Sequence, residues 1–424
     1  MSLIRLYRRD PSSTPLPYTA SPLQLFFRDI MLLLRYSWAL PGILLPLRLG
    51  HTTPLDELYL SFGSLISFLV QVVLTIAQIA FLVSIPLMVV FQLPAFWIFV
   101  YIAVSLALNY GVCMFVLNGF ERILASNVPE PNQPGHEGEC WFFINGVANS
   151  QYWLQNNIDQ LAYSFGRKIT GIHNRTSGLI FDLIECLIQR CFSYATGDIR
   201  SAYYLLKREL LNPNCDKVVM ILHSQGGIEG SLVIDWLLDE LPQDLLHKLE
   251  VYTFGNAANH FNNPRQSSTC QPIVRSIGHI EHYANSQDAV SHLGVLHFTN
   301  VPNRYLGRLF IRPGSGHMMN QHYLDTMFTL GPDHRVLESN AFMDKEVNMK
   351  WGESDRLLNR RDENREMTLL PIPNIEVSNS PESRQSNGSP TWRVKDFSRL
   401  WQYRNGGTPG RAPGLRQEDD RSLL

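Results

Sequence analysis

Charge is scarce in this sequence, and its two signs nearly cancel. The 424 residues include 36 Lys and Arg against 38 Asp and Glu, which gives a formal net charge of −2. The charged fraction of 17% is below the roughly 25% of an average soluble domain. Proteins that bind nucleic acid carry a basic excess, so we expect no nucleic-acid partner.

Cysteine is sparse as well. The six cysteines form no CxxC pair and no dense framework; they are Cys113, Cys140, Cys186, Cys191, Cys215 and Cys270. This pattern excludes a disulfide-stapled secreted domain and fits a reducing compartment. No long apolar run stands near the start of the chain, so we expect no cleaved signal peptide.

The lack of charge is most complete in residues 58–120, where 63 consecutive residues contain no Asp, Glu, Lys, Arg or His. One membrane span needs about 20 apolar residues, and a charge at mid-bilayer is unfavourable by roughly 2.5–3.5 kcal/mol. We therefore predict two transmembrane helices, at residues 65–90 and 94–116, joined by a tight turn. The stretch shows no polar stripe of the kind that a soluble helical hairpin needs.

The segment before this hairpin, residues 1–57, reads as an amino-terminal arm. Residues 23–34 are apolar but broken by Arg28 and Asp29, which favours an amphipathic helix at the membrane interface. An ordinary docked helix is the alternative. The arm contains six Arg and no Lys, so the positive-inside rule predicts that both flanks of the hairpin are cytosolic. The organelle cannot be predicted. A glycosylation sequon at Asn174 would matter only on the lumenal side.

Beyond the hairpin the composition changes twice. Residues 121–138 read as a linker, and residues 139–345 have the mixed pattern of a compact α/β domain. Residues 346–424 are rich in charged residues, Ser, Asn, Pro and Gly, which predicts a largely disordered tail. Its one aromatic patch, residues 392–403, suggests a short binding helix.

The clearest chemical motif lies around Ser224. Residues 218–222 are apolar and predict a buried strand, and residues 228–241 have the apolar spacing of a helix. A strand, a sharp turn with Ser and a helix form a nucleophile elbow, which exposes the serine Oγ near the helix amino terminus. The backbone amide of Gln225 can then donate to a developing oxyanion.

The segment His223-Ser224-Gln225-Gly226-Gly227 resembles the elbow of the lipase and serine-esterase branch of the α/β-hydrolases. It matches the pattern G-x-S-x-G at Ser224 and Gly226, but Leu222 stands where that family has its first glycine. The resemblance covers residues 139–345. This part of the chain is similar to the serine-esterase domain of uncharacterised fungal membrane proteins. It implies an α/β-hydrolase fold, a mostly parallel sheet flanked by helices, which here follows the two-helix transmembrane hairpin.

The same resemblance suggests the partners of Ser224. Asp288 follows a predicted strand, residues 273–283, and fits the triad acid, although a helix N-cap is its alternative role. His317 lies in a glycine-rich loop after the last predicted strand, residues 306–312, and fits the general base. His322, inside the predicted helix 318–328, is the rival base. The amide of Val147, after a strand at 141–144, fits the second oxyanion donor.

These residues predict a membrane-anchored serine hydrolase that cleaves carboxylic esters through an acyl-enzyme. The anchor suggests lipid acyl esters as substrates and the bilayer as a partner; protein partners are not predicted. Leu222 leaves open a catalytically degenerate fold that serves as a membrane scaffold, and the SQGG motif leaves open a protein-acyl thioesterase. We expect no cofactor and no metal, since four nearby histidines, His279, His282, His292 and His297, match no ligand pattern.

Overall fold

The described part of the chain is built around one seven-stranded sheet. The computed structural model describes residues 21–47, 53–128, 136–264, 275–301, 304–347 and 393–409. The strand order is β1-β3-β2-β4-β5-β6-β7, and neighbours are parallel except for β1 with β3. The strands are β1 Ile123–Ala125, β2 Glu139–Ile144, β3 Ile169–Ile172, β4 Lys217–His223, β5 Leu249–Phe254, β6 His279–Asn285 and β7 Arg308–Arg312.

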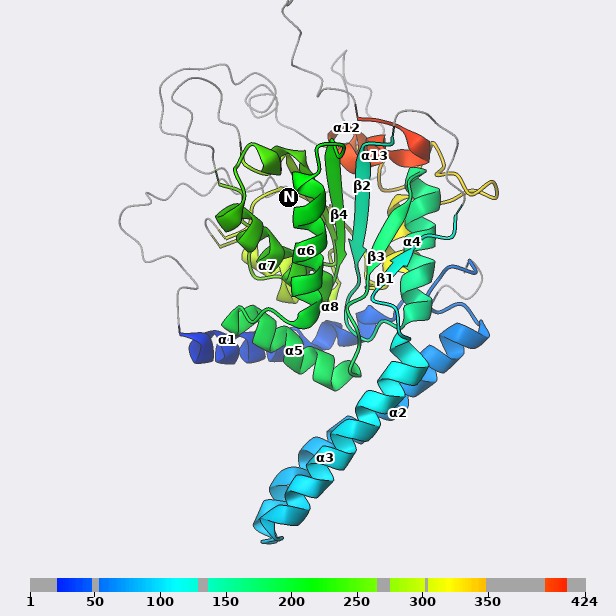
Figure 1. The fold of residues 1–424 in the computed structure, drawn as a ribbon. Helices are drawn as coiled ribbons and strands as arrows, with labels where there is room; N and C mark the ends of the chain where they lie inside the picture. Colours follow the sequence, from blue (N-terminus) through cyan, green and yellow to red (C-terminus); the bar gives the residue numbers. More distant parts are fainter. Residues whose placement is uncertain are drawn as a thin grey trace, which may run out of the picture.

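Helices cover both faces of the sheet (Figure 1). One face packs against α6 Gly197–Leu211, α7 Gln225–Glu240, α9 Val295–Phe298 and the turn η3 Leu245–Lys248. The other packs against α4 Gln151–Phe165, η4 Met319–Leu324, α10 Asp325–Met327, α12 Val394–Phe397 and α13 Arg399–Gln402. Parallel sheets need this double cover because both of their faces are apolar.

Strand β4 shows how the sequence produces this arrangement. Successive side chains of a strand point to opposite faces. Val218, Met220 and Leu222 therefore join the core on the α6–α7 side, whereas Val219 and Ile221 join the core on the α4 side. A run of apolar residues without alternation is what a strand buried on both faces requires.

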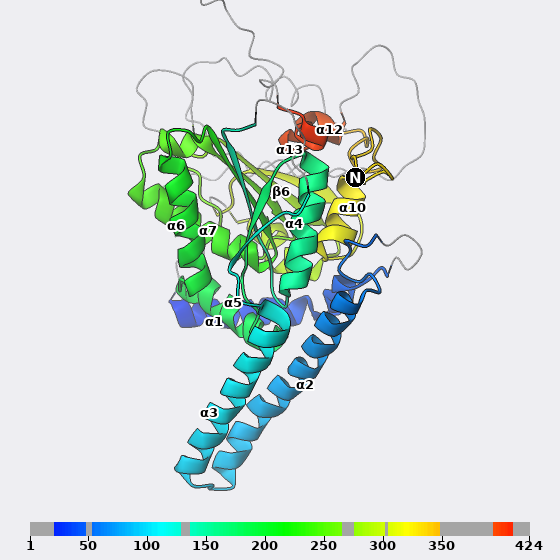
Figure 2. The same ribbon diagram turned by 45° about the vertical axis from the view of Figure 1, so that its right-hand side comes forward.

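The helical hairpin extends away from the sheet domain (Figures 1 and 2). It consists of α2 Phe62–Val90 and α3 Ala95–Val112, which continues as the π-helical segment η2 Cys113–Asn118. Both helices are long and apolar enough to cross a membrane, and only 11% of the most apolar window of each is buried. Ser61 caps α2 by accepting a hydrogen bond from the Ser64 amide.

The hairpin does carry a polar stripe, contrary to our sequence interpretation. Ser64, Ser67, Gln71 and Gln78 are all buried along one side of α2. Their spacing of three, four and seven residues keeps them on one helix face. The interpretation missed them because they are uncharged and stand singly among apolar neighbours. This face packs on the sheet domain, and another side of α2 contacts α3. Much of the rest of the helix surface is apolar and exposed.

The amino-terminal arm crosses below the sheet, beside the base of the hairpin (Figure 1). It forms α1 Pro22–Arg35 and the 3₁₀ segment η1 Ser37–Ile43. The Asp29 carboxylate accepts two 2.8 Å hydrogen bonds from the Arg190 guanidinium on α5 Leu179–Phe192. Both side chains are buried, so this pair ties α1 to α5.

Two predicted boundaries need correction. The linker expected at 121–138 contains β1, which pairs with β3 at the sheet edge. The tail expected at 346–424 contains α12 and α13, where Leu400, Trp401 and Tyr403 are buried in the core. The Arg399 guanidinium also donates to Glu250 at 2.8 Å. The predicted binding helix is thus part of the domain, and residues 348–392 and 410–424 lie outside the described residues.

Candidate active site

The predicted site residues gather at the carboxyl edge of the sheet. Ser224 follows β4, Asp288 follows β6 and His317 follows β7. Because β4 to β7 are parallel, the loops after these strands meet at one edge, where ligand sites of α/β sheets usually form. This edge lies beside the arm, since the amides of Gly316 and His317 donate to the carbonyls of Gly42 and Ile43 at 2.9 and 3.2 Å.

Ser224 occupies a strained turn between β4 and α7. Its φ is +57° and its ψ is −120°, a region that non-glycine residues rarely adopt without imposed strain. A Cβ on Gly226 would collide with the carbonyl oxygen of Ile144 in β2. Glycine therefore lets the start of α7 approach β2 closely. This is the geometry of a nucleophile elbow.

Leu222, the departure from the family pattern, has a structural partner. It is fully buried, and a Cβ on Gly230 of α7 would collide with its side chain. In the family pattern, a small residue in the strand leaves room for the helix. In this chain the strand has Leu222, and Gly230 of the helix leaves the room instead. No local pattern in the sequence links Leu222 to a residue eight positions later.

Asp288 and His317 form a hydrogen-bonded pair. The Nδ1–H of His317 donates to Asp288 Oδ2 at 2.9 Å. The same oxygen accepts hydrogen bonds from the hydroxyls of Tyr323 at 2.6 Å and Ser291 at 2.9 Å. Burial by itself raises the pKa of Asp288, but His317 and these hydrogen bonds outweigh it and hold that pKa below its ordinary value. Asp288 is therefore ionised at neutral pH. It is also the N-cap of α8 Ala289–Leu293, so the two roles coexist.

The other ring nitrogen of His317 differs from Nδ1 in its contacts. Its Nε2 is buried and has no hydrogen-bond partner among the described residues. With the proton held on Nδ1 by Asp288, Nε2 carries the lone pair. The backbone of His317 is held by a hydrogen bond, because the Nε2–H of His223 donates to its carbonyl at 2.8 Å. Burial lowers the pKa of His223 to about 3, which keeps that second ring neutral.

Gly255, after β5, brings Ser224 and the His317–Asp288 pair together. The Ser224 amide donates to the carbonyl of Phe254 at 3.1 Å. Gly255 itself has a φ of +56°, and a Cβ there would lie 2.8 Å from His317 Cε1 and 3.1 Å from Asp288 Oδ2. Only glycine fits a position with this φ and such close neighbours.

His322, the rival base, lies elsewhere and is engaged at both ring nitrogens. Its Nδ1 accepts a hydrogen bond from the Met318 amide at 3.0 Å, and its Nε2–H donates to the carbonyl of Pro46 at 3.1 Å. Neither nitrogen contacts Asp288 among these bonds. The structure thus brings His317, and not His322, to the predicted acid.

The two predicted oxyanion donors flank Ser224. Gln225 is the first residue of α7, so its amide belongs to a helix amino terminus, where backbone N–H groups point outward. Val147 lies in the loop after β2. The preceding residue, Gly146, touches the nucleophile: a Cβ there would lie 2.5 Å from Ser224 Cβ and 3.0 Å from its Oγ. The next amide, that of Ala148, donates to Asp182 at 2.8 Å, so it is not the amide that the prediction concerns.

The sequon asparagine is part of this neighbourhood. The side-chain amide of Asn174 is buried and donates to Gln225 Oε1 at 2.8 Å. The Asn174 backbone amide donates to Asn145 Oδ1 at 2.9 Å. A glycan would need this side chain at the surface, so the sequon is structural in the folded protein and says nothing about sidedness.

Comparisons with known proteins add little to this geometry. No protein-family model and no curated protein matches the sequence. Among solved structures the chain is similar to Est1E from Butyrivibrio proteoclasticus, with 11% identity over 48% of this chain and 87% of that chain and a TM-score of 0.28. For Est1E with bound ferulic acid, the identity is 11% over 48% of this chain and 90% of that chain, and the TM-score is 0.26. The resemblance to fungal membrane proteins stays a prediction.

The fold is that of an α/β-hydrolase with a helical hairpin before it. This assignment rests on the mostly parallel sheet, the helices on both faces and the elbow at Ser224. The polar network around the elbow includes residues that no sequence motif marks. Tyr323 and Ser291 support Asp288, and Asp182 holds the loop of Val147.

The pairing of Leu222 with Gly230 makes a prediction about stability. Leu222→Ala and Gly230→Ala should each lower the free energy of unfolding, the first by leaving a cavity and the second by a clash. Combined, they should recover about 1–2 kcal/mol relative to additivity, because the new Cβ fills part of the cavity. Denaturant unfolding of the four proteins in detergent measures this coupling. The control cycle combines Leu222→Ala with Gly227→Ala. Additive effects of Leu222→Ala and Gly230→Ala on the free energy of unfolding would contradict the pairing.

Proposed function

We propose that this chain is a membrane-anchored serine hydrolase that cleaves carboxylic esters, with Ser224 as nucleophile, His317 as general base and Asp288 as the orienting acid. The observation that carries the proposal is the Asp288–His317 hydrogen bond of 2.9 Å, which leaves a buried Nε2 on His317 that no other described residue engages. A carboxylate that holds an imidazole in this tautomer, at the same edge of the sheet as a serine in an elbow turn, is the set of groups that nucleophilic catalysis needs.

The reaction follows from these groups. Ser224 Oγ attacks the ester carbonyl while His317 Nε2 takes its proton. Asp288 stabilises the imidazolium that forms. The amides of Gln225 and Val147 donate to the oxyanion of the tetrahedral intermediate. Collapse releases the alcohol, which takes the proton from His317, and leaves Ser224 acylated. Water, deprotonated by His317, then releases the carboxylic acid and restores the serine.

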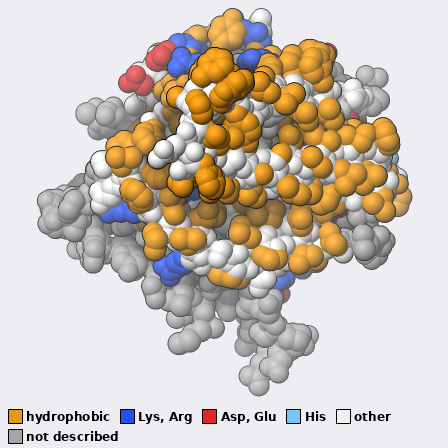
Figure 3. All heavy atoms as spheres, turned by 90° about the horizontal axis from the view of Figure 1, so that it is seen from below, with side chains coloured by type: hydrophobic (Ala, Val, Ile, Leu, Met, Phe, Trp, Pro, Cys, Tyr) orange, Lys and Arg blue, Asp and Glu red, His pale blue; other side chains and the backbone are white. Residues whose placement is uncertain are grey.

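The position of the site favours a lipid ester as substrate. The carboxyl edge of the sheet lies on the side of the molecule from which the hairpin extends (Figures 1 and 2). Seen from that side, the surface is largely hydrophobic, and its Lys and Arg side chains lie toward the margins (Figure 3). An apolar face of this size rimmed by charge fits a membrane surface.

Two helices beside the hairpin supply much of this face. On α1 the exposed residues Leu23, Phe27, Met31 and Leu34 form one stripe, and on α5 Ile184, Ile188 and Phe192 form another. The Asp29–Arg190 pair links the buried sides of the two helices. This supports the interfacial role predicted for residues 23–34. We infer that a site at this edge of the sheet receives its substrate from the bilayer.

The decisive test of hydrolysis is the nucleophile itself. A fluorophosphonate probe should label the full-length protein, and Ser224→Ala should abolish both labelling and turnover of short acyl esters. Only a serine activated by its base and oxyanion donors reacts with this probe. Gel fluorescence and ester turnover provide the readouts, with Ser231→Ala, a buried serine on the same helix, as control. A wild-type protein that fails to label would instead favour the inert scaffold.

Substitutions of the two histidines should differ in their effect on kcat. His317→Gln should reduce kcat by about a thousandfold or more, since the base is lost. His322→Gln should retain kcat within a few-fold, because the hydrogen bond to Asp288 comes from His317, whereas the ring nitrogens of His322 bond to the backbone of Met318 and Pro46 and to the Gln321 side chain. Steady-state kinetics on one ester compares them. Equal losses in both variants would remove the assignment of His317.

We propose, from the arginine bias of residues 1–57, that the hydrolase domain faces the cytosol. In sealed microsomes with the cytosolic side outward, trypsin added outside should digest the domain without detergent. Protection of the domain until detergent is added would reverse this orientation. A soluble lumenal marker serves as the control for sealing.

A further inference from the structure

The polar stripe of α2 contacts the loops of the candidate site. The indole of Trp153 donates to Ser64, and the Ser67 hydroxyl bonds to the Ser150 hydroxyl at 2.7 Å. Polar side chains in an apolar membrane helix are unfavourable unless they are hydrogen-bonded, and they tend to serve function. The stripe therefore points to a role for the hairpin beyond anchoring.

Gln71 reaches the loop that carries Val147. Its Nε2 donates to the carbonyl of Ala148 at 3.1 Å and to the Thr176 hydroxyl at 3.2 Å. Ala148 directly follows the predicted oxyanion donor. The hairpin thus holds one end of the peptide chain that lies beside the nucleophile.

The other backbone group of Ala148 is held by Asp182. The Ala148 amide donates to Asp182 Oδ2 at 2.8 Å, and the Thr176 hydroxyl donates to the same oxygen at 2.6 Å. The Ser177 amide donates to Oδ1 at 2.7 Å. Burial raises the pKa of Asp182 to about 6, so at neutral pH the carboxylate is mostly ionised and accepts all three bonds.

Ala148 needs this support because its backbone is strained. Its φ is +54°, a conformation that is unfavourable by about 1 kcal/mol for a residue with a Cβ. Gln71 holds its carbonyl and Asp182 holds its amide. Together they fix the two peptide planes on either side of Ala148. The chain is thereby anchored one peptide unit away from the Val147 amide.

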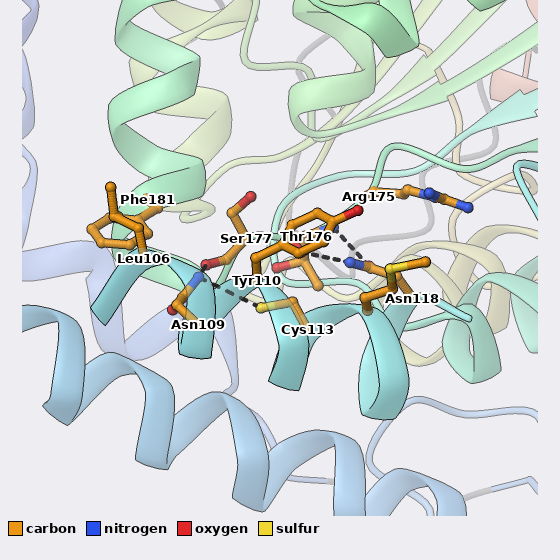
Figure 4. Close-up of a pocket in the computed structure, with 10 residues that line it drawn as sticks. Leu106, Asn109, Tyr110, Cys113, Asn118, Arg175, Thr176, Ser177 and Phe181 are labelled. Atoms are coloured by element: carbon orange, nitrogen blue, oxygen red, sulfur yellow. Dashed lines mark hydrogen bonds between the residues drawn. The ribbon is translucent and has the colours of Figure 1, made fainter. Parts of the chain in front are cut away.

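Further contacts from the hairpin secure the loop around Thr176 (Figure 4). Asn118 donates to the Thr176 carbonyl at 2.8 Å and accepts from the Thr176 amide at 3.0 Å. Gln78 and Asn109 donate to the Ser177 carbonyl at 2.7 and 2.9 Å. Thr176, which bridges Gln71 to Asp182, is therefore fixed on both sides by α2 and the end of α3.

We propose that Gln71 is a positioning residue for catalysis: through Ala148, Thr176 and Asp182 the membrane hairpin orients the oxyanion loop. This inference rests on the proposed serine-hydrolase function. Oxyanion donors act only within about 0.5 Å of their working position, and a misplacement of about 1 Å can lower a rate by about a hundredfold. The hairpin is then a structural part of the active site as well as its anchor.

The test compares isosteric changes inside the hairpin and the loop. Gln71→Met removes the donor with little change in volume, and Thr176→Val removes the bridging hydroxyl. We expect both to lower kcat and the fluorophosphonate labelling rate about tenfold or more, with KM within about threefold, because the loss acts on the transition state. Thr176→Ser, which keeps the hydroxyl, should restore wild-type rates.

Ser84→Ala is the matched control. Ser84 also lies on α2 and bonds to the Tyr101 hydroxyl on α3 at 2.9 Å. This bond joins the two hairpin helices to each other rather than to the site. The variant should label and turn over like the wild type. Losses equal to those of Gln71→Met would mean that hairpin packing in general, and not the contact to Ala148, affects the site.

Two outcomes distinguish this proposal from the function on which it rests. If labelling depends on Ser224 but Gln71→Met labels at the wild-type rate, the positioning role is overturned and the hydrolase stands. If the wild type does not label, the proposed hydrolase function fails. Hydrogen exchange then tests whether Gln71 fixes the loop at Ala148. Gln71→Met should then speed exchange about tenfold in peptides covering residues 145–149 and 174–178 alone. Unchanged exchange there, or a rise throughout the sheet, would overturn it.

Discussion

Ser224 holds a backbone conformation, with φ at +57°, that a residue with a side chain adopts only when its surroundings impose it. The central strand β4 enters the turn from a fully buried position, and α7 leaves it in close contact with β2. Gly226 permits that contact. Gly230 leaves the space that Leu222 fills. The direction of the serine hydroxyl, and therefore every other role at this edge of the sheet, depends on this packing.

The hairpin and the arm belong to the same structure as the site. The arm carbonyls of Gly42 and Ile43 bind the loop of His317, and Gln71 of α2 binds the loop of Val147. The proposed base and the loop of the proposed donor Val147 are thus each hydrogen-bonded to a segment that we propose to contact the membrane. Loops are the mobile parts of most folds, and here they are fixed by the segments that we propose to meet the bilayer.

Much of the fold could be predicted from the sequence because its signals are local. The run without charge indicated the hairpin, and the short apolar runs at 141–144 and 218–222 indicated β2 and β4. The prediction failed where local signals are weak. Strand β1 has three residues and is defined by pairing with β3. Helices α12 and α13 have four residues each and follow a polar stretch, so only their packing distinguishes them from a tail.

The sequence by itself determined the presence of an elbow serine, of histidines after the last strand and of a hairpin without charge, since each depends on residues close together in the chain. Only the tertiary structure decided which histidine meets Asp288, how Leu222 is accommodated and what the glutamines of α2 contact. The bond from Gln71 to Ala148 spans 77 positions, and that from His317 to Asp288 spans 29. Such contacts depend on how helices and strands pack, and packing is a property of the whole chain rather than of any one segment.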